Sequence, residues 1–152
     1  MPEPAENIAP LDAKGNHPVG EGLLRAEYEA RASGDLDAFA RLLTEDVLWH
    51  VPGDNAIAGV YRGIDDVVAY VQVRQSLTGG SFRVNVEDIV ANERHGLAVA
   101  SGSADIRGRE ERWRAHGLYR FRGEKIAECW VVPEDQSEFD RIWAEEAAGC
   151  DG

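Results

Sequence analysis

Cysteine and methionine are scarce in this 152-residue sequence, which has two cysteines and one methionine. Two cysteines cannot form the set of disulfides that staples a small secreted domain. No stretch approaches the roughly 18 consecutive apolar residues that a membrane-spanning helix needs, and no basic start followed by an apolar run marks an export signal. We therefore expect neither a disulfide scaffold nor a membrane protein, and a cytoplasmic location.

Basic residues are also under-represented. Lysine and arginine together number 16 against 28 aspartates and glutamates, which gives a formal net charge of −12. Such an acidic surface repels phosphate backbones and anionic lipids, so nucleic acid and membrane surfaces are excluded as expected partners. The acidic balance is otherwise the ordinary means of keeping a protein in solution.

Motifs for metals, phosphates and nucleophiles are missing as well. The four histidines show no HxH or HxxxH pairing, and no glycine-rich phosphate loop follows a predicted strand. There is no GxSxG elbow, and Cys129 stands in an apolar run with no obvious base beside it. We therefore expect no metal and no cofactor.

The composition that remains is that of one globular domain. Hydrophobic residues make up 43% and charged residues 29% of the chain, which is ordinary usage, and the length suffices to bury a core. Four of the six prolines fall before residue 20. We expect a flexible N-terminal arm over 1–19, the domain over 20–146, and a frayed tail with Cys150 over 147–152.

The hydrophobic periodicity predicts helices first and strands afterwards. Helical spacing appears over 20–33, and Gly34 is the expected C-terminal cap of this helix. A second, short helix follows Asp35, which is its expected N-terminal cap, and a third covers 65–77. Alternating or apolar strand patterns cover 47–51, a segment from Phe82, 97–104, 111–122 and 125–132, and Asp135 opens a last short helix. The region 54–63 between the first strand and the third helix reads as a loop. This order predicts the α+β class, with three helices on a curved, mostly antiparallel sheet around one apolar pocket.

Two parts of the chain resemble a known family. GDLDAFARLLTEDVLWHVPG followed by AGVYRGIDDVVAYV, and later AHGLYRFRGEKIAECWVVPEDQ, are similar to nuclear-transport-factor-2-like proteins of the SnoaL type. That group includes polyketide cyclases and relatives of ketosteroid isomerase. The resemblance implies a cone-shaped α+β barrel with a ligand cavity, although this fold hosts many unrelated activities.

The family's functional residues are mostly replaced. Where the isomerases have a tyrosine on the first helix and aspartates on two strands, this chain has Glu27, Val51 and Gly117. The polyketide cyclases carry an acid after the tryptophan of the last strand, whereas here Val131 follows Trp130. Neither mechanism transfers intact, and steroid isomerisation is disfavoured.

Three residues are the candidates for catalysis. Glu27 stands where the isomerases place a pocket tyrosine, and a carboxyl group in apolar surroundings suits proton transfer; alternatively it is a solvated glutamate on the outer helix face. His50 is the natural acid/base at neutral pH, but strict alternation places it on the sheet face away from the pocket unless a bulge intervenes. Tyr61 is either a hydrogen-bond donor at the pocket rim or a surface tyrosine.

The expected pocket lining follows from the alternation of the strands and the spacing of the first helix. Residues that converge on the interior are either lining or simple core; they are Tyr28, Trp49, Val51, Trp113, Tyr119, Cys129 and Val131. His116 alternates to the outer face, with Arg114 and Trp130. A tryptophan on an open sheet face calls for cover, so we expect a homodimer through this outer face.

Three functions remain open at this point. One is a cofactor-independent enzyme that isomerises, dehydrates or cyclises a small apolar organic molecule by general acid/base proton transfer. Another is a non-catalytic binding protein for an apolar metabolite, which the loss of the family's acids favours. A third possibility is an interaction module whose cavity is filled by its own side chains.

Overall fold

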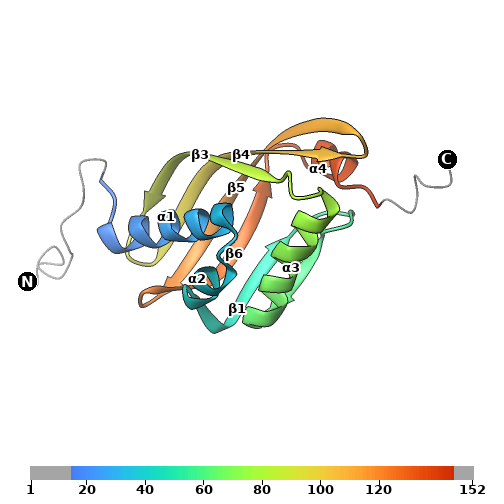
Figure 1. Ribbon diagram of the computed structural model, residues 1–152. Coiled ribbons are helices and arrows are strands. Elements are labelled where there is room, and N and C mark those ends of the chain that lie inside the picture. The colour runs from blue at the N-terminus through green and yellow to red at the C-terminus, as the bar shows by residue number, and fades with distance from the viewer. Residues whose placement is uncertain (1–14, 146–152) are drawn as a thin grey trace, which may run out of the picture.

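The computed structural model describes residues 15–145 (Figure 1). The predicted tail over 147–152, and the predicted arm up to residue 14, lie outside the described residues. The elements in chain order are α1 (Pro18–Ser33), α2 (Leu36–Arg41), β1 (Leu43–Val51), β2 (Gly59–Arg62), α3 (Gly63–Leu77), β3 (Arg83–Ala91), β4 (His95–Ile106), β5 (Arg109–Arg122), β6 (Lys125–Pro133) and α4 (Gln136–Ile142).

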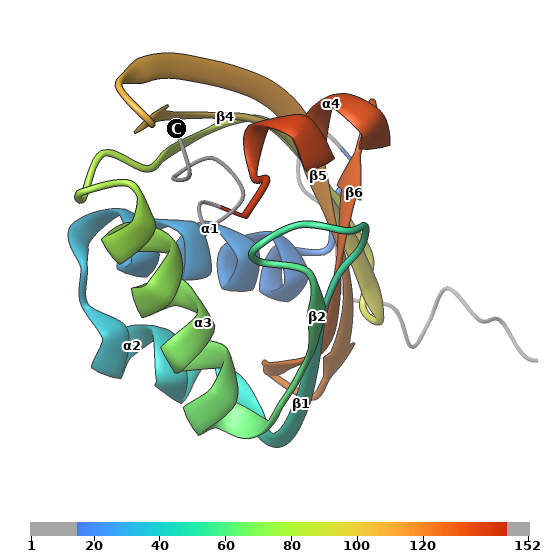
Figure 2. The same cartoon turned by 90° about the vertical axis from the view of Figure 1, so that its right-hand side faces the viewer.

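The strands form one six-stranded sheet in the order β2-β1-β6-β5-β4-β3. Only the β1–β6 pair is parallel within this sheet, and the other neighbours run antiparallel. The sheet is strongly curved, and α1, α2 and α3 lie on its concave side (Figure 2). Helix α1 contacts β3 and β4 while α3 contacts β1 and β2, so the two long helices cover opposite halves of the sheet. This is the predicted α+β architecture.

The helix boundaries follow from local chemistry. Pro18 occupies the first turn of α1, where its missing N–H costs nothing. Gly34 ends the helix in the left-handed conformation, with φ of 76°, as the sequence predicts. One residue later, the Asp35 carboxylate accepts the Ala38 N–H at 3.0 Å and starts α2. The chain therefore reverses direction between two capped helices.

Two boundaries differ from the predictions. The segment expected as a loop over 54–63 contains the four-residue strand β2, which pairs with β1 and extends the sheet by one strand. The expected arm also ends earlier than residue 19, because Asn16 is buried against β3. Its side chain donates to the Ile89 carbonyl at 2.7 Å and accepts the Ala91 N–H at 2.7 Å.

The strand register aligns side chains in rows across the sheet. On the concave face, Cys129 of β6 stands between Trp49 of β1 and Tyr119 of β5. On the convex face, Trp130 stands between His50 and Leu118 in the same way. The first row belongs to the core, where all three side chains are at most 1% exposed. In the part of the chain that the structure describes, no helix is both long and apolar enough to cross a membrane.

Candidate functional site

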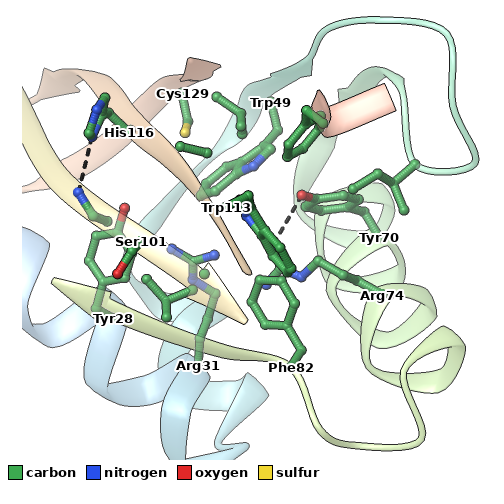
Figure 3. A pocket seen from close by; sticks show the side chains of 18 of the residues that line it. Tyr28, Arg31, Trp49, Tyr70, Arg74, Phe82, Ser101, Trp113, His116 and Cys129 are labelled. Carbon is green, nitrogen blue, oxygen red and sulfur yellow. Dashed lines mark hydrogen bonds between the residues drawn. The ribbon is translucent and has the colours of Figure 1, made fainter. Parts of the chain in front are cut away.

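A cavity opens between the concave face of the sheet and helices α1 and α3 (Figure 3). The space in it that admits the centre of a water molecule is about 60 Å³. Six of the residues expected at a pocket line it: Tyr28, Trp49, Trp113, Tyr119, Cys129 and Val131. The seventh, Val51, is a buried core residue that does not reach the cavity. Alternation along the strands brings the five strand residues of this set to the concave face, and α1 adds Tyr28.

Three hydrogen-bonded groups run from the cavity wall into the core. The Tyr119 hydroxyl donates to Oε1 of Glu27 at 2.9 Å and lies 2.7 Å from the Tyr28 hydroxyl. A hydroxyl has one proton. Since Tyr119 gives its proton to the acceptor-only carboxylate, the Tyr28 hydroxyl supplies the proton of the second bond. The result is an ordered relay from Tyr28 through Tyr119 to Glu27.

Glu27 is fully buried, but it is not an isolated carboxyl group in an apolar pocket. Arg31, one helical turn further along α1, donates to its Oε2 in a buried ion pair. Glu27 does not line the cavity, whereas Arg31 and Tyr119 do, so the carboxylate lies behind them. Burial by itself would lower the pKa of Arg31, but the adjacent Glu27 charge raises this pKa well above its usual value. The pair therefore keeps both charges in the interior.

The hydroxyl and thiol groups near Glu27 all have raised pKa values. Burial, followed by the negative charge of Glu27, raises the pKa of the Tyr28 hydroxyl above its usual value. Burial likewise raises the pKa of Tyr119 and that of the Cys129 thiol. Because the thiolate is the nucleophilic form of cysteine, Cys129 is an inert core thiol. The two tyrosines stay protonated at neutral pH, as a hydroxyl relay requires.

Arg31 also packs against aromatic rings. Its guanidinium carbon lies 4.6 Å from the ring centroid of Tyr28 and 5.5 Å from that of Trp49. Both contacts fall within the range of cation–π attraction. They fix the arginine between helix and sheet, and thereby hold the Glu27 carboxylate toward Tyr119.

The structure places His50 and Tyr61 away from the cavity. His50 lies on the convex face, where its ring stacks on Trp130 at a centroid distance of 5.3 Å and its Nε2 lies 2.6 Å from Glu128. The Tyr61 hydroxyl donates to the Ile57 carbonyl at 2.7 Å. Neither residue belongs to the cavity lining. Of the three candidates for catalysis, only Glu27 connects to the cavity.

His116 borders the cavity and also contacts groups outside it. It contributes to the cavity lining, yet its Nδ1 accepts the Ala100 N–H at 3.1 Å and its Nε2 lies 2.7 Å from the Glu134 carboxylate (Figure 3). Both ring nitrogens are therefore engaged. Because Nδ1 is an acceptor, the proton of the neutral ring sits on Nε2 and points to Glu134.

The sequence analysis missed two arginines of the cavity, although the sequence carried a signal for each. Arg31 follows Glu27 at the four-residue spacing of a helical ion pair. Arg74 follows Val67, Tyr70 and Val71 at the spacing of the buried face of α3. A charged residue at such a position is rare unless it has a partner or a function. Within residues 15–145, no cluster of three or more histidines, cysteines or carboxylates could hold a metal ion.

The match to a family model defines the class of this protein. The model of the SnoaL-like domain matches residues 24–129, which include most of α1, all of α3 and most of the sheet. The chain belongs to this family. A relative from Mycobacterium tuberculosis, itself described as an uncharacterized protein, is 31% identical over 123 residues, covering 80% of this chain and 94% of the relative.

Solved structures agree on the fold. Bal32a, from a soil-derived mobile gene cassette, superposes with a TM-score of 0.79 and 21% identity over 83% of this chain and 97% of its own. An NTF2-like protein from Burkholderia xenovorans has a TM-score of 0.71 and 18% identity over 83% and 96% of the two chains. The chain therefore has the nuclear-transport-factor-2-like fold that its sequence resembles.

Gly117 makes the space in which the two hydroxyls meet. A Cβ atom at this position would lie 2.6 Å from Cε1 of Tyr119 and 2.8 Å from the Tyr28 hydroxyl oxygen. We predict that Gly117→Ala lowers the free energy of unfolding by about 1–3 kcal/mol through overpacking, measured by urea denaturation. Gly22→Ala is the control, because nothing lies within 4 Å of its Cβ position on α1 and alanine favours helix. Equal stability of Gly117→Ala and the parent would contradict the tight contact.

Proposed function

We propose that the cavity is the active site of a cofactor-independent enzyme that transfers a proton on a small, largely apolar organic molecule. The observation that carries the proposal is the relay from the cavity wall to a buried carboxylate, formed by Tyr28, Tyr119 and Glu27. Isomerisation, dehydration or ring closure of a polyketide-like compound are the reactions that membership of the SnoaL-like family suggests. Each of them begins or ends with a proton moving at carbon or oxygen.

The relay supports abstraction of a proton next to a carbonyl group. The substrate C–H bond breaks as the Tyr28 oxygen takes its proton, while the proton of Tyr28 passes to Tyr119 and that of Tyr119 to Glu27. The Glu27 carboxylate is thus the final acceptor, two hydroxyls away from the substrate. No free tyrosinate forms, which fits the raised pKa values of both tyrosines. Return of the protons along the same path completes an isomerisation.

The electron pair of the broken C–H bond moves to the carbonyl oxygen of the substrate, and this oxygen needs hydrogen-bond donors. Trp49 and Trp143 line the cavity, and their buried indole N–H groups have no hydrogen-bond partner in the described part of the chain. They are the donors available for such an oxygen. The apolar and aromatic remainder of the lining excludes water from the reacting atoms.

Binding without turnover is the second candidate. Arg31 already occupies the Oε2 oxygen of Glu27 in a buried ion pair, an observation that favours a structural role for the carboxylate and a carrier or sensor of an apolar metabolite. A protein of that kind releases its ligand chemically unchanged, whereas the proposed enzyme exchanges the ligand's acidic protons with solvent. The two functions therefore differ in one measurable property of the bound ligand.

We predict that the protein catalyses exchange of the protons next to the carbonyl group of 2-tetralone, an apolar bicyclic ketone, in heavy water. Tyr28→Phe removes the first hydroxyl of the relay and is expected to lower the exchange rate by about a hundredfold, measured by proton NMR. Tyr61→Phe is the matched variant. The Tyr61 hydroxyl donates to the Ile57 carbonyl, away from the cavity. We therefore expect the exchange rate of Tyr61→Phe to stay within about twofold of the parent rate. Equal exchange rates for Tyr28→Phe and the parent protein would contradict the proposed relay.

We also propose that the chain forms a homodimer through the convex face of the sheet. Leu118 and Val132 are 41% and 42% exposed there, next to Trp130 on neighbouring positions of β5 and β6. Burying such a patch between two copies removes apolar surface from water. Light scattering at micromolar concentration should give about twice the 16.7 kDa mass of the chain. Leu118→Glu should shift the mass to that of one chain, and a parent protein of monomer mass would overturn this proposal.

A further inference from the structure

The walls of the cavity are cationic in a strongly acidic protein. No aspartate or glutamate is among the lining residues of the cavity or of the groove that adjoins it between α1, α3 and β3. Three arginines do line them: Arg31 and Arg74 line both spaces, and Arg83 lines the groove. With 28 acidic residues in the chain against 16 basic ones, a cavity and groove without a carboxylate in their lining depart from the average composition of the chain.

Arg74 is the unusual member of this group. It is 6% exposed, and its Nη1 donates to the Tyr70 hydroxyl at 3.0 Å. Its guanidinium carbon lies 3.9 Å from the centroid of the Phe82 ring. Among the described residues, its Nε has no hydrogen-bond partner and no carboxylate forms an ion pair with it. Figure 3 shows its side chain reaching from α3 toward Phe82 and the centre of the cavity.

The charges of the interior do not cancel without a ligand. Glu27 forms its ion pair with Arg31 and attracts Arg74 only from a distance, and no carboxylate of the described residues contacts Arg74. Burial lowers the pKa of Arg74 below its usual value, and the positive charge of Arg31 acts in the same direction. A buried charge without a counter-ion costs several kcal/mol. A protein retains such a group when something that binds there supplies the opposite charge.

We propose that Arg74 is the binding site for a carboxylate on the apolar ligand of this cavity. The proposal rests on the proposed function, because the same cavity holds the substrate, and it narrows the substrate class to apolar organic acids. A guanidinium group is suited to this role, since its planar N–H donors match both oxygens of a carboxylate. The arginine-lined groove leads an anion to this point, while the aromatic lining takes up the apolar part.

The test uses a pair of probes with the same shape, naphthalene-2-carboxylate and naphthalene-2-carboxamide, titrated by isothermal calorimetry at pH 7. We expect the parent protein to bind the carboxylate at least about tenfold more tightly than the amide, as a charge-assisted pair provides. Arg74→Met should abolish this preference while leaving binding of the amide within about twofold. Arg74→Lys keeps the charge and should retain part of the preference.

A role of Arg74 in packing alone makes a different prediction. Loss of the Tyr70 and Phe82 contacts would then lower the melting temperature, whereas removal of an uncompensated buried charge should leave it unchanged or raise it. Arg25→Met is the control, because this arginine lies in an exposed ion pair with Glu21 on α1 and should alter neither binding nor stability.

Two results would overturn the inference: a parent protein that does not prefer the carboxylate, or an Arg74→Met protein that keeps the preference. Should Arg74→Met fail to fold, a full preference for the carboxylate in Arg74→Lys with none in Arg31→Met would place the site at Arg31 and contradict the assignment. Exchange of 2-tetralone protons that depends on Tyr28 would leave the proposed function intact in either case. Conversely, carboxylate binding without any Tyr28-dependent exchange would contradict the proposed function and leave the anion site standing.

Discussion

The buried ion pair between Glu27 and Arg31 is the constraint on which the rest of the interior depends. Two charges withdrawn from water are costly unless every remaining donor and acceptor is engaged. Here Tyr119 donates to the second oxygen of the carboxylate, and aromatic rings of Tyr28 and Trp49 face the guanidinium. These contacts join α1 to strands β1 and β5 of the sheet. The position of the helix over the sheet, and hence the width of the cavity, is tied to their geometry.

The cavity itself arises from the sizes of side chains in neighbouring rows. Large aromatic residues on β5 stand beside glycines on β4 and β5, and a Cβ atom at Gly96, Gly102 or Gly117 would lie within 2.8 Å of a neighbouring side-chain atom. The rings therefore lean over the glycines and leave space above the centre of the sheet. Strand curvature and this pairing of large with small residues produce a chamber whose polar groups are few and individually placed.

Much of this arrangement could be predicted from the sequence. The helical caps at Gly34 and Asp35 and the buried thiol Cys129 follow from local chemistry and alternation. Strand β2 could not be predicted, because four residues gain strand structure only through pairing with β1. The contact between Glu27 and Tyr119 could not be predicted either. Tyr119 lies 92 residues away along the chain, and only the sheet register brings its hydroxyl to the carboxylate.

The central claim is that Tyr119 and Glu27 act as one relay and not as two independent groups. The most direct measurement is the rate of 2-tetralone proton exchange for Glu27→Gln, Tyr119→Phe and the double variant. A relay is lost when any member is lost, so each single change should lower the rate by about a hundredfold, and the double variant should be no slower than the slower single variant. A double variant slower by the product of the two single effects would show that the residues act separately and would contradict the account.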